Sequence, residues 1–256
     1  GTNTKNFIGN KLQCAKVLDL SRLSGIVEYL PEELYIKVKA CTPISLIEES
    51  LEKNNQQLAF EPIDFGYLKD FNPNKGTAAG QLSCNFSGSR RFKVGSLRDH
   101  ILGFRGVNGK GDIIKSGGTV VKNVTGYYLS KLVTGSFGTL VALTEITFKV
   151  LPKKDSISTL VIYSEDNKVI TDLFDQLLSS SNEISGAAYI PNEPNNKNYT
   201  QNIEKIFKFN DLKYKGPFVA IRIEGSKKSI DERIQNISQE LQIKKMKTTK
   251  MRPIKP

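Results

Sequence analysis

The chain has 256 residues and a mass of 28.5 kDa, enough for one large or two ordinary domains, and 38% of its residues are hydrophobic. Apolar residues recur along its length, which excludes a fully disordered chain, and no run of about 18 apolar residues predicts a membrane-spanning segment. The net charge is +11, from 37 basic and 26 acidic residues, but the basic residues are scattered and mostly Lys. Because no aromatic stacking surface or recognition helix accompanies them, we expect no nucleic-acid partner.

Cysteine and histidine usage limits the chemistry further. Cys14, Cys41 and Cys84 are few and far apart, which predicts neither a disulfide framework nor a zinc site and favours a reducing cytoplasm. His100 is the only histidine, so a metal site or catalytic triad built on several histidines is excluded. The chain begins at Gly1 without a charged-then-apolar leader, and we expect no secretion signal. We expect the basic tail, residues 244–255, to be solvated and partly disordered.

The first third of the chain has the pattern of short strands followed by a helix. Strands are predicted over residues 17–20, 26–29 and 34–40, the last with a clear two-residue alternation. Thr42 and Pro43 then indicate the start of a helix, with Thr42 as its N-cap, and this helix ends near residue 54. Such an order favours an α+β fold over a doubly wound parallel sheet.

Glycines are concentrated in the middle of the chain, where 13 of the 20 fall between Gly76 and Gly138. Within this stretch, residues 77–85 are mostly small and predict a short helix packed close to a bulky neighbour. The Asn108-Gly pair predicts a hairpin of strands 101–107 and 112–116. Residues 120–133 look helical in their second half, and residues 139–151 predict a long strand or strand pair that ends at Pro152.

The remainder of the chain has a different pattern, which predicts a second domain of βαβ type. Strands are expected at residues 159–163 and 218–224, helices at 168–178 and 229–241, and a polar loop at 191–202. We place the boundary near residues 152–155, which gives one domain over residues 1–152 and another over residues 153–256.

Two loops have the composition of an anion-binding cradle. Residues 1–9 and 77–89 are rich in Gly, Ser and Thr, so that backbone N–H groups can approach a phosphate without obstruction by side chains. Neither loop matches a Walker or Rossmann pattern, and taken alone each is more typical of a surface turn.

Five motifs in a fixed order give these loops a family context. They are the second loop with Gly88-Ser-Arg-Arg91, then Gly95-Ser-Leu-Arg-Asp99, Lys122-Asn-Val-Thr-Gly-Tyr127, Gly135-Ser-Phe-Gly-Thr-Leu140 and Thr144-Glu-Ile146. In order and spacing they resemble the FAD-binding PCMH-type domain of the vanillyl-alcohol oxidase and p-cresol methylhydroxylase superfamily. Within it, the chain is similar to the FAD-binding subunits of bacterial glycolate oxidases, densely over residues 1–152 and faintly to about residue 241.

The resemblance implies a fold and a set of cofactor-binding residues. The implied fold is a FAD-binding domain of two α+β subdomains, here without its first strand, followed by a partial α+β substrate or cap domain. The implied pyrophosphate loop comprises Gly1, Thr2, Asn3 and Thr4. The second loop, along the pyrophosphate, ribityl chain and flavin, comprises Thr77, Ala78, Ala79, Gly80, Ser83, Asn85 and Gly88. Gly95 and Ser96 match the turn near the isoalloxazine, and the strand around Thr144 and Ile146 matches the segment whose backbone meets the adenine.

This sequence departs from the family pattern at several positions. Ala79, Tyr128 and Val141 stand where the family usually has Gly, Asp and Gly, and the added methyl of Ala79 could crowd the pyrophosphate. No His or Cys lies in the pyrophosphate loop, so we expect FAD to be bound non-covalently and no metal to be needed. We interpret Arg98-Asp99 as a structural ion pair, and His100 as a packed, hydrogen-bonded side chain.

The implied function is oxidation of a small 2-hydroxy acid to a 2-oxo acid. Oxidation needs a base and a cation for the substrate carboxylate, and the second domain offers only Arg222 and Arg233 before its tail. We therefore expect a supporting or electron-relaying FAD subunit, with unknown catalytic residues, in a complex with a homologous flavin-containing sister subunit and an iron–sulfur subunit. The expected location is the cytoplasm, with peripheral association at the inner face of the membrane left open. The alternatives are a stand-alone FAD-dependent 2-hydroxy-acid dehydrogenase and a non-catalytic scaffold that has lost FAD.

Overall fold

The computed structural model describes residues 16–64, 76–119, 127–163, 166–191, 217–243 and 247–251. The chain divides into two compact units, Gly1–Lys153 and Lys154–Pro256, which are called unit 1 and unit 2 below. The predicted loops at residues 1–9 and 191–202 fall wholly or mostly outside the described residues, as do residues 122–126. No helix among the described residues is both long enough and apolar enough to cross a bilayer.

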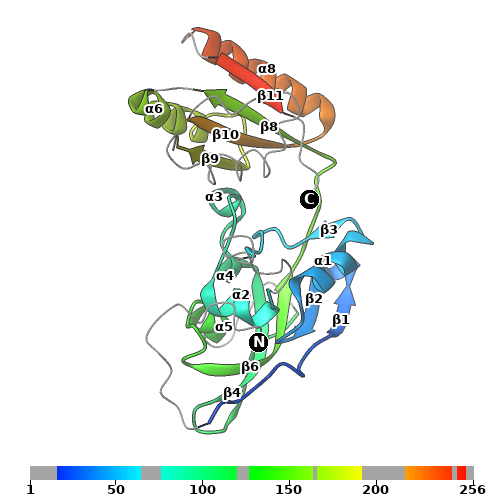
Figure 1. The fold of residues 1–256 in the computed structure, drawn as a ribbon. Coiled ribbons are helices and arrows are strands. Elements are labelled where there is room, and N and C mark those ends of the chain that lie inside the picture. The colour runs from blue at the N-terminus through cyan, green and yellow to red at the C-terminus, as the bar shows by residue number, and fades with distance from the viewer. Residues whose placement is uncertain are drawn as a thin grey trace. The chain divides into compact units, whose positions relative to one another are not determined.

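A five-stranded antiparallel sheet organises unit 1 (Figure 1). In spatial order its strands are β1 (Ile26–Leu30), β2 (Tyr35–Lys39), β6 (Val141–Lys149), β4 (Ile101–Asn108) and β5 (Ile113–Gly117). The central strand β6 pairs with β2 on one side and with β4 on the other, so it joins the beginning of the unit to its end. A short ladder of β3 (Gln56–Gln57) with β7 (Leu151–Pro152) adds a second link between these regions.

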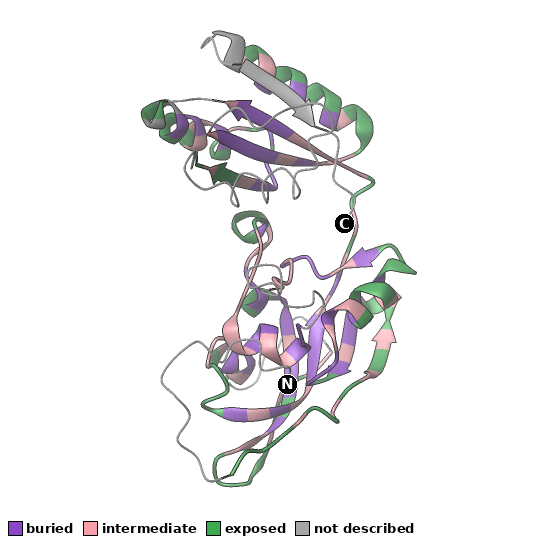
Figure 2. Cartoon of the chain, in the orientation of Figure 1, coloured by how far each residue is buried: buried purple, intermediate pink, exposed green. Residues whose placement is uncertain are grey.

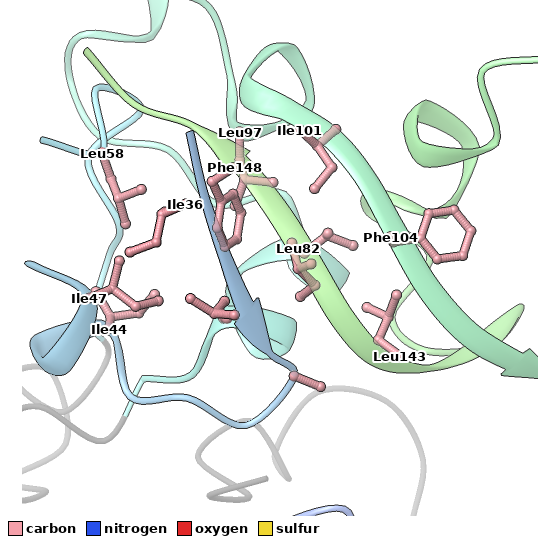
Figure 3. Close-up of a cluster of buried hydrophobic side chains, with 14 of the residues drawn as sticks. Ile36, Ile44, Ile47, Leu58, Leu82, Leu97, Ile101, Phe104, Leu143 and Phe148 are labelled. Carbon is pink, nitrogen blue, oxygen red and sulfur yellow. The ribbon is translucent and has the colours of Figure 1, made fainter. Parts of the chain in front are cut away.

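Short helices contribute apolar side chains to one core with this sheet. They are α1 (Ile44–Glu52), α2 (Ala78–Cys84), α4 (Leu97–His100) and α5 (Leu129–Val133); α3 (Arg91–Val94) and a 3-10 turn (Pro31–Glu33) complete the unit. Figure 3 shows Leu82 of α2 and Ile47 of α1 in the same cluster as Phe148 of the sheet. Since these side chains are at most 1% exposed, helices and sheet form a single core.

Two details of the first third differ from the prediction. Residues 17–20 form no strand, because no neighbouring strand pairs with them among the described residues, and Val17 and Leu18 are 79% and 75% exposed. Thr42 is not the N-cap of α1, since the helix begins one residue later with Pro43 in that position. Instead the Thr42 hydroxyl lies 2.7 Å from the carbonyl oxygen of Lys39 and accepts a hydrogen bond of 3.0 Å from the N–H of Gly25. The hydroxyl therefore ties the end of β2 to the start of β1.

The predicted hairpin of β4 and β5 is confirmed. The side-chain oxygen of Asn108 accepts hydrogen bonds of 2.9 Å from the N–H groups of Lys110 and Asp112, which fixes the turn. The predicted short helix at residues 77–85, the helix after Pro43 and the strand pair before and at Pro152 are also confirmed.

Unit 2 contains a four-stranded antiparallel sheet with strands in the order β11 (Lys247–Met251), β8 (Ser156–Tyr163), β10 (Phe218–Gly225) and β9 (Gly186–Ile190). Helix α6 (Asn167–Leu178) follows β8, and α8 (Lys227–Ile243) follows β10, so two βαβ units interlock as a split βαβ fold. Apolar residues of both helices pack on the central strands, where burial is concentrated (Figure 2).

The basic tail of unit 2 differs from its prediction. Residues 244–255 were expected to be solvated and partly disordered, with no strand, whereas Lys247–Met251 form β11 and pair with β8 from Tyr163 to Thr159. The sequence also gave no prediction for β9. Both are edge strands, which need fewer apolar residues than central ones and leave a weaker alternation in the sequence.

Candidate functional site

The start of α2 is held against the end of β2. The Thr77 hydroxyl caps the helix by accepting a hydrogen bond of 3.3 Å from the N–H of Gly80. The N–H groups of Ala78 and Ala79 donate to the carbonyl oxygens of Thr42 and Ala40, at 3.0 and 2.8 Å. The first three N–H groups of the helix are therefore satisfied within the protein. What this end of α2 offers a ligand is small side chains rather than free amides.

The end of α2 brings three of the sequence motifs together. Asn85 adopts the left-handed conformation, with φ of 52°, and its side-chain oxygen accepts a hydrogen bond of 3.1 Å from the N–H of Arg98. The carbonyl oxygen of Ser83 accepts a hydrogen bond of 2.8 Å from the N–H of Phe137. The predicted second loop is thus joined both to the Gly95–Asp99 motif and to the turn at residues 135–140.

A buried arginine clamps the next part of this loop. Arg90 is 5% exposed, and its guanidinium donates a hydrogen bond of 2.6 Å to the side-chain oxygen of Gln57. Its backbone N–H donates to a Glu61 carboxylate oxygen at 2.8 Å, and its Nε lies 3.9 Å from the other. Gly88 packs so closely on Glu61 that a Cβ there would lie 2.6 Å from the Glu61 Cβ. Glu61, Gln57 and Arg90 therefore determine the position of the loop at Gly88.

Sequence reasoning missed this clamp, although a signal was present. Glu61 and Gln57 lie about 30 positions before Arg90 and belong to no motif, so only the fold brings them together. The one local signal was the pair Arg90-Arg91 in the middle of a recognised motif. Arg90 is buried and Arg91 is exposed, a difference that the sequence does not indicate.

The turn at Gly95 and Ser96 is closed by a capping box at the start of α4. The Ser96 N–H and hydroxyl both donate to the Asp99 carboxylate, at 2.8 and 3.0 Å. Burial alone would raise the pKa of Asp99, but these hydrogen bonds outweigh it and hold the pKa below its ordinary value. The interpretation of Asp99 as structural is confirmed, but its partner is Ser96 and not Arg98. The carbonyl oxygen of Arg98 accepts a hydrogen bond from the Lys131 ammonium group.

His100 is a packed side chain, as the sequence indicated. It is 3% exposed, its ring centroid lies 5.9 Å from that of Phe60, and its Nε2 lies 3.0 Å from the carbonyl oxygen of Val94. That contact requires a proton on Nε2, which leaves Nδ1 without a hydrogen-bond partner among the described residues. Burial lowers the pKa of His100 below its ordinary value of 6.5, against the contribution of the Val94 carbonyl, which raises it.

The lowered pKa of His100 predicts a loss of stability in acid. As pH falls through about 6.5, the imidazole of the unfolded chain takes up a proton before that of the folded protein does. The unfolded state then binds more protons, so the free energy of unfolding falls. His100→Phe keeps a ring beside Phe60 but cannot titrate. We therefore expect the free energy of unfolding of this variant to fall less between pH 8 and pH 5.5 than that of the parent. Urea unfolding at both pH values measures the difference, and equal losses would show that His100 does not contribute.

The two strand residues predicted to meet the adenine lie in different environments. Ile146 is fully buried in the core and its backbone pairs with both Val38 and Phe104, whereas the Thr144 hydroxyl donates to the carbonyl oxygen of Arg105 at 3.0 Å. Gly1, Thr2, Asn3 and Thr4 lie outside the described residues. The cofactor contacts of these six residues stay predictions.

A run of exposed apolar side chains lies at residues 127–140, next to the end of α2. Between residue 127, just before α5, and residue 140, just before β6, five of them are 47% to 89% exposed: Tyr127, Tyr128, Leu132, Phe137 and Leu140. Phe137 adopts a left-handed φ of 54° and, as described above, its N–H contacts the end of α2. Exposed apolar side chains concentrated in one segment are typical of a surface that binds a ligand or another protein.

The two arginines of unit 2 that precede the tail are engaged within the unit. The Nε of Arg222 lies 3.1 Å from a Glu224 carboxylate oxygen, and its guanidinium also donates to Ser185. Arg233 donates to the carbonyl oxygens of Glu224 and Asn182, at 2.6 and 3.3 Å. Both therefore have structural partners. No cluster of three or more potential metal-ligating side chains is present in the described part of the chain.

Comparison with known proteins gives this geometry a context. Residues 1–117 match the family of the FAD binding domain. The chain is 42% identical over 153 residues to glycolate oxidase subunit GlcE of Escherichia coli, which covers 60% of this chain and 41% of that protein. It is 31% identical over 150 residues to a D-lactate dehydrogenase of Anaerostipes hadrus, which covers 59% of this chain and 30% of that protein. Glycolate oxidase subunit GlcD of Bacillus subtilis is 40% identical over 90 residues, or 35% of this chain and 19% of that protein.

Solved structures agree in fold. An alkyldihydroxyacetonephosphate synthase superposes with a TM-score of 0.67 at 18% identity, over 93% of this chain and 43% of that one. The predicted α+β, PCMH-type FAD-binding fold is confirmed. The chain spans less than half the length of each of these relatives.

Proposed function

Because residues 1–117 match the FAD binding domain family, we propose that this chain is the FAD-binding subunit of a glycolate oxidase-like complex. The complex would oxidise a small 2-hydroxy acid to the 2-oxo acid. The observation that carries the proposal is the 42% identity to glycolate oxidase subunit GlcE, which extends over 153 residues. The similarity to glycolate oxidase subunit GlcD supports the same reaction class.

The described residues fit the ring systems of FAD better than its pyrophosphate. Exposed apolar side chains at residues 127–140 adjoin the small residues of α2, and flat aromatic rings favour such a surface. The N–H groups of Ala78, Ala79 and Gly80 already have acceptors, so we assign the pyrophosphate to Gly1–Thr4. Thr77, Ser83, Asn85, Gly88, Gly95 and Ser96 would shape and hold the rest of the site. When bound, FAD supplies the hydride-accepting chemistry.

We expect the FAD to be bound non-covalently. The proposed pyrophosphate loop contains no His or Cys, and the only histidine of the chain is buried with its Nε2 against the Val94 carbonyl. Denaturation in acid should therefore release all flavin into the supernatant.

The partners of Arg222 and Arg233 within unit 2 favour a supporting role of this chain in substrate oxidation. A 2-hydroxy acid needs a cation for its carboxylate and a base for its hydroxyl proton. His100, Arg222 and Arg233 already have structural partners, so we assign the primary oxidation to a homologous flavin-containing sister subunit. This chain would bind FAD and relay electrons, with an iron–sulfur subunit as a third partner. Such a complex would lie in the cytoplasm or at the inner face of the cytoplasmic membrane.

Turnover assays with purified subunits test the role of the chain. We expect dye reduction with glycolate only when the FAD-loaded chain and the sister subunit are combined. Turnover by the chain alone, tested with glycolate and with D-lactate, would contradict the supporting role. That result would favour the alternative of a stand-alone FAD-dependent dehydrogenase, which the similarity to a D-lactate dehydrogenase supports.

A further inference from the structure

The sheet of unit 1 has one apolar and one charged face. Successive side chains of a strand point to opposite faces, so Ile36, Phe104 and Phe148 point into the core with the helices (Figure 3). The residues that alternate with them therefore point to the other side. The charged residues on that side include Lys37, Lys39, Arg105, Lys115, Glu145 and Lys149.

A pocket of about 290 Å³ lies over this charged face. Gly103 contributes to its lining and has no side chain; a Cβ there would lie 2.9 Å from both the Gly118 nitrogen and the Ser116 carbonyl oxygen. The backbone at the end of β5 can therefore approach β4 closely. The pocket is lined by this turn, by the hydroxyl-bearing residues Thr119 and Thr147, and by charged residues of the strands.

The charges that line the pocket are not balanced. Glu145 is the one acidic residue of the lining: its carboxylate lies 3.7 Å from the Lys37 ammonium group, and it is also the partner of Arg105 across β4 and β6, so one carboxylate faces three cations. Arg105 and Lys115 are direct partners across β4 and β5. Neither forms an ion pair with another residue in the parts of the chain that the structure describes. Like charges directly opposite each other destabilise a sheet unless an anion lies between them.

We propose that this pocket binds the phosphoryl group of a small anionic ligand, held between Arg105 and Lys115. Guanidinium and ammonium groups together favour a phosphoryl dianion, and neighbouring hydroxyls add hydrogen bonds. The volume exceeds that of a bare phosphate, so a small phosphorylated metabolite fits. The pocket lies on the face of the sheet opposite to α2 and α4, whose apolar residues pack in the core. Its residues Glu145 and Thr147 belong to the strand predicted to meet the adenine, so the test includes an arm with FAD.

Thermal unfolding of the full chain with inorganic phosphate tests the proposal. At equal ionic strength, phosphate at ten times its Kd should raise the Tm by about 3 °C or more, and succinate should not. The Arg105→Gln/Lys115→Gln variant should lose this shift. The Lys53→Gln/Lys110→Gln variant removes the same charge from exposed positions outside the pocket and should keep it.

Any of the following outcomes would overturn the proposal. Equal shifts with phosphate and succinate would show a general anion effect, and an unchanged shift in Arg105→Gln/Lys115→Gln would place phosphate elsewhere. No shift in the parent would show that the pocket does not bind phosphate. The experiment is repeated with FAD present, where the shift should persist, whereas its loss would place the phosphate in the FAD site. Because the first arm uses protein without FAD, it can be interpreted even if the proposed function fails.

Discussion

The Gly117→Ala variant is expected to lose about 3 kcal/mol of the free energy of unfolding. Gly117 has a φ of +74°, and a Cβ there would lie 2.0 Å from the carbonyl oxygen of Leu102 and 2.8 Å from the Cα of Gly103. Both the left-handed backbone and the close approach of β4 oppose a side chain. The loss should appear in urea unfolding followed by far-ultraviolet circular dichroism, which suits a chain without Trp.

Gly118→Ala is the matched control for this prediction. It adds the same methyl one residue further along, where no atom lies within 4 Å of the added Cβ and φ is not positive. We expect its free energy of unfolding to stay within about 0.5 kcal/mol of the parent. Similar losses in the two variants would contradict the assignment of the effect to the backbone of Gly117.

Arg90→Met is expected to cost about 2–3 kcal/mol and to weaken FAD binding at least tenfold. Removing the guanidinium leaves the side-chain oxygen of Gln57 without its donor and the Glu61 carboxylate without a neighbouring charge. The loop at Gly88 then loses part of the contact that positions it. Unfolding in urea measures the first effect, and fluorescence titration with FAD measures the second.

Arg91→Met provides the control for Arg90→Met. It removes the same charge from the next residue, which is exposed, and we expect both stability and FAD affinity to match the parent. If the two variants behaved alike, Arg90 would not be a positioning residue for the loop. If Arg90→Met lost stability but kept its FAD affinity, Arg90 would stabilise the fold without positioning residues that bind FAD.

Local patterns were sufficient where one short segment determines the structure. Asn108-Gly predicted the hairpin of β4 and β5 because its side chain bonds to the turn that it begins. The small residues around Ala78 predicted α2, since close packing against β2 requires them. In both cases the interactions lie within, or next to, the segment that carries the pattern.

Contacts between distant segments could not be predicted in this way. Thr42 looks like an N-cap from its neighbours, but its hydroxyl contacts Gly25, which only the sheet brings near. The clamp of Arg90 by Glu61 has the same origin. Strand β11 was missed because its pairing with β8 outweighs a basic composition that is typical of a solvated tail.

The same distinction applies to the candidate site. Motif order indicated the resemblance to FAD-binding domains, and the fold brings Ser83, Asn85 and the turn at Phe137 together. The sequence did not indicate that the first N–H groups of α2 are already satisfied. That observation restricts the expected pyrophosphate contacts to residues 1–4, already assigned to the pyrophosphate loop, and leaves α2 as a surface of small side chains.

The central claim is that this chain binds FAD, and a visible absorbance spectrum tests it most directly. The full chain is incubated with FAD, separated from free FAD by gel filtration and examined for the flavin bands. We predict retained flavin close to one equivalent per chain, all of it released by acid denaturation. A spectrum without flavin bands after reconstitution would contradict the account and would favour a scaffold that has lost its cofactor.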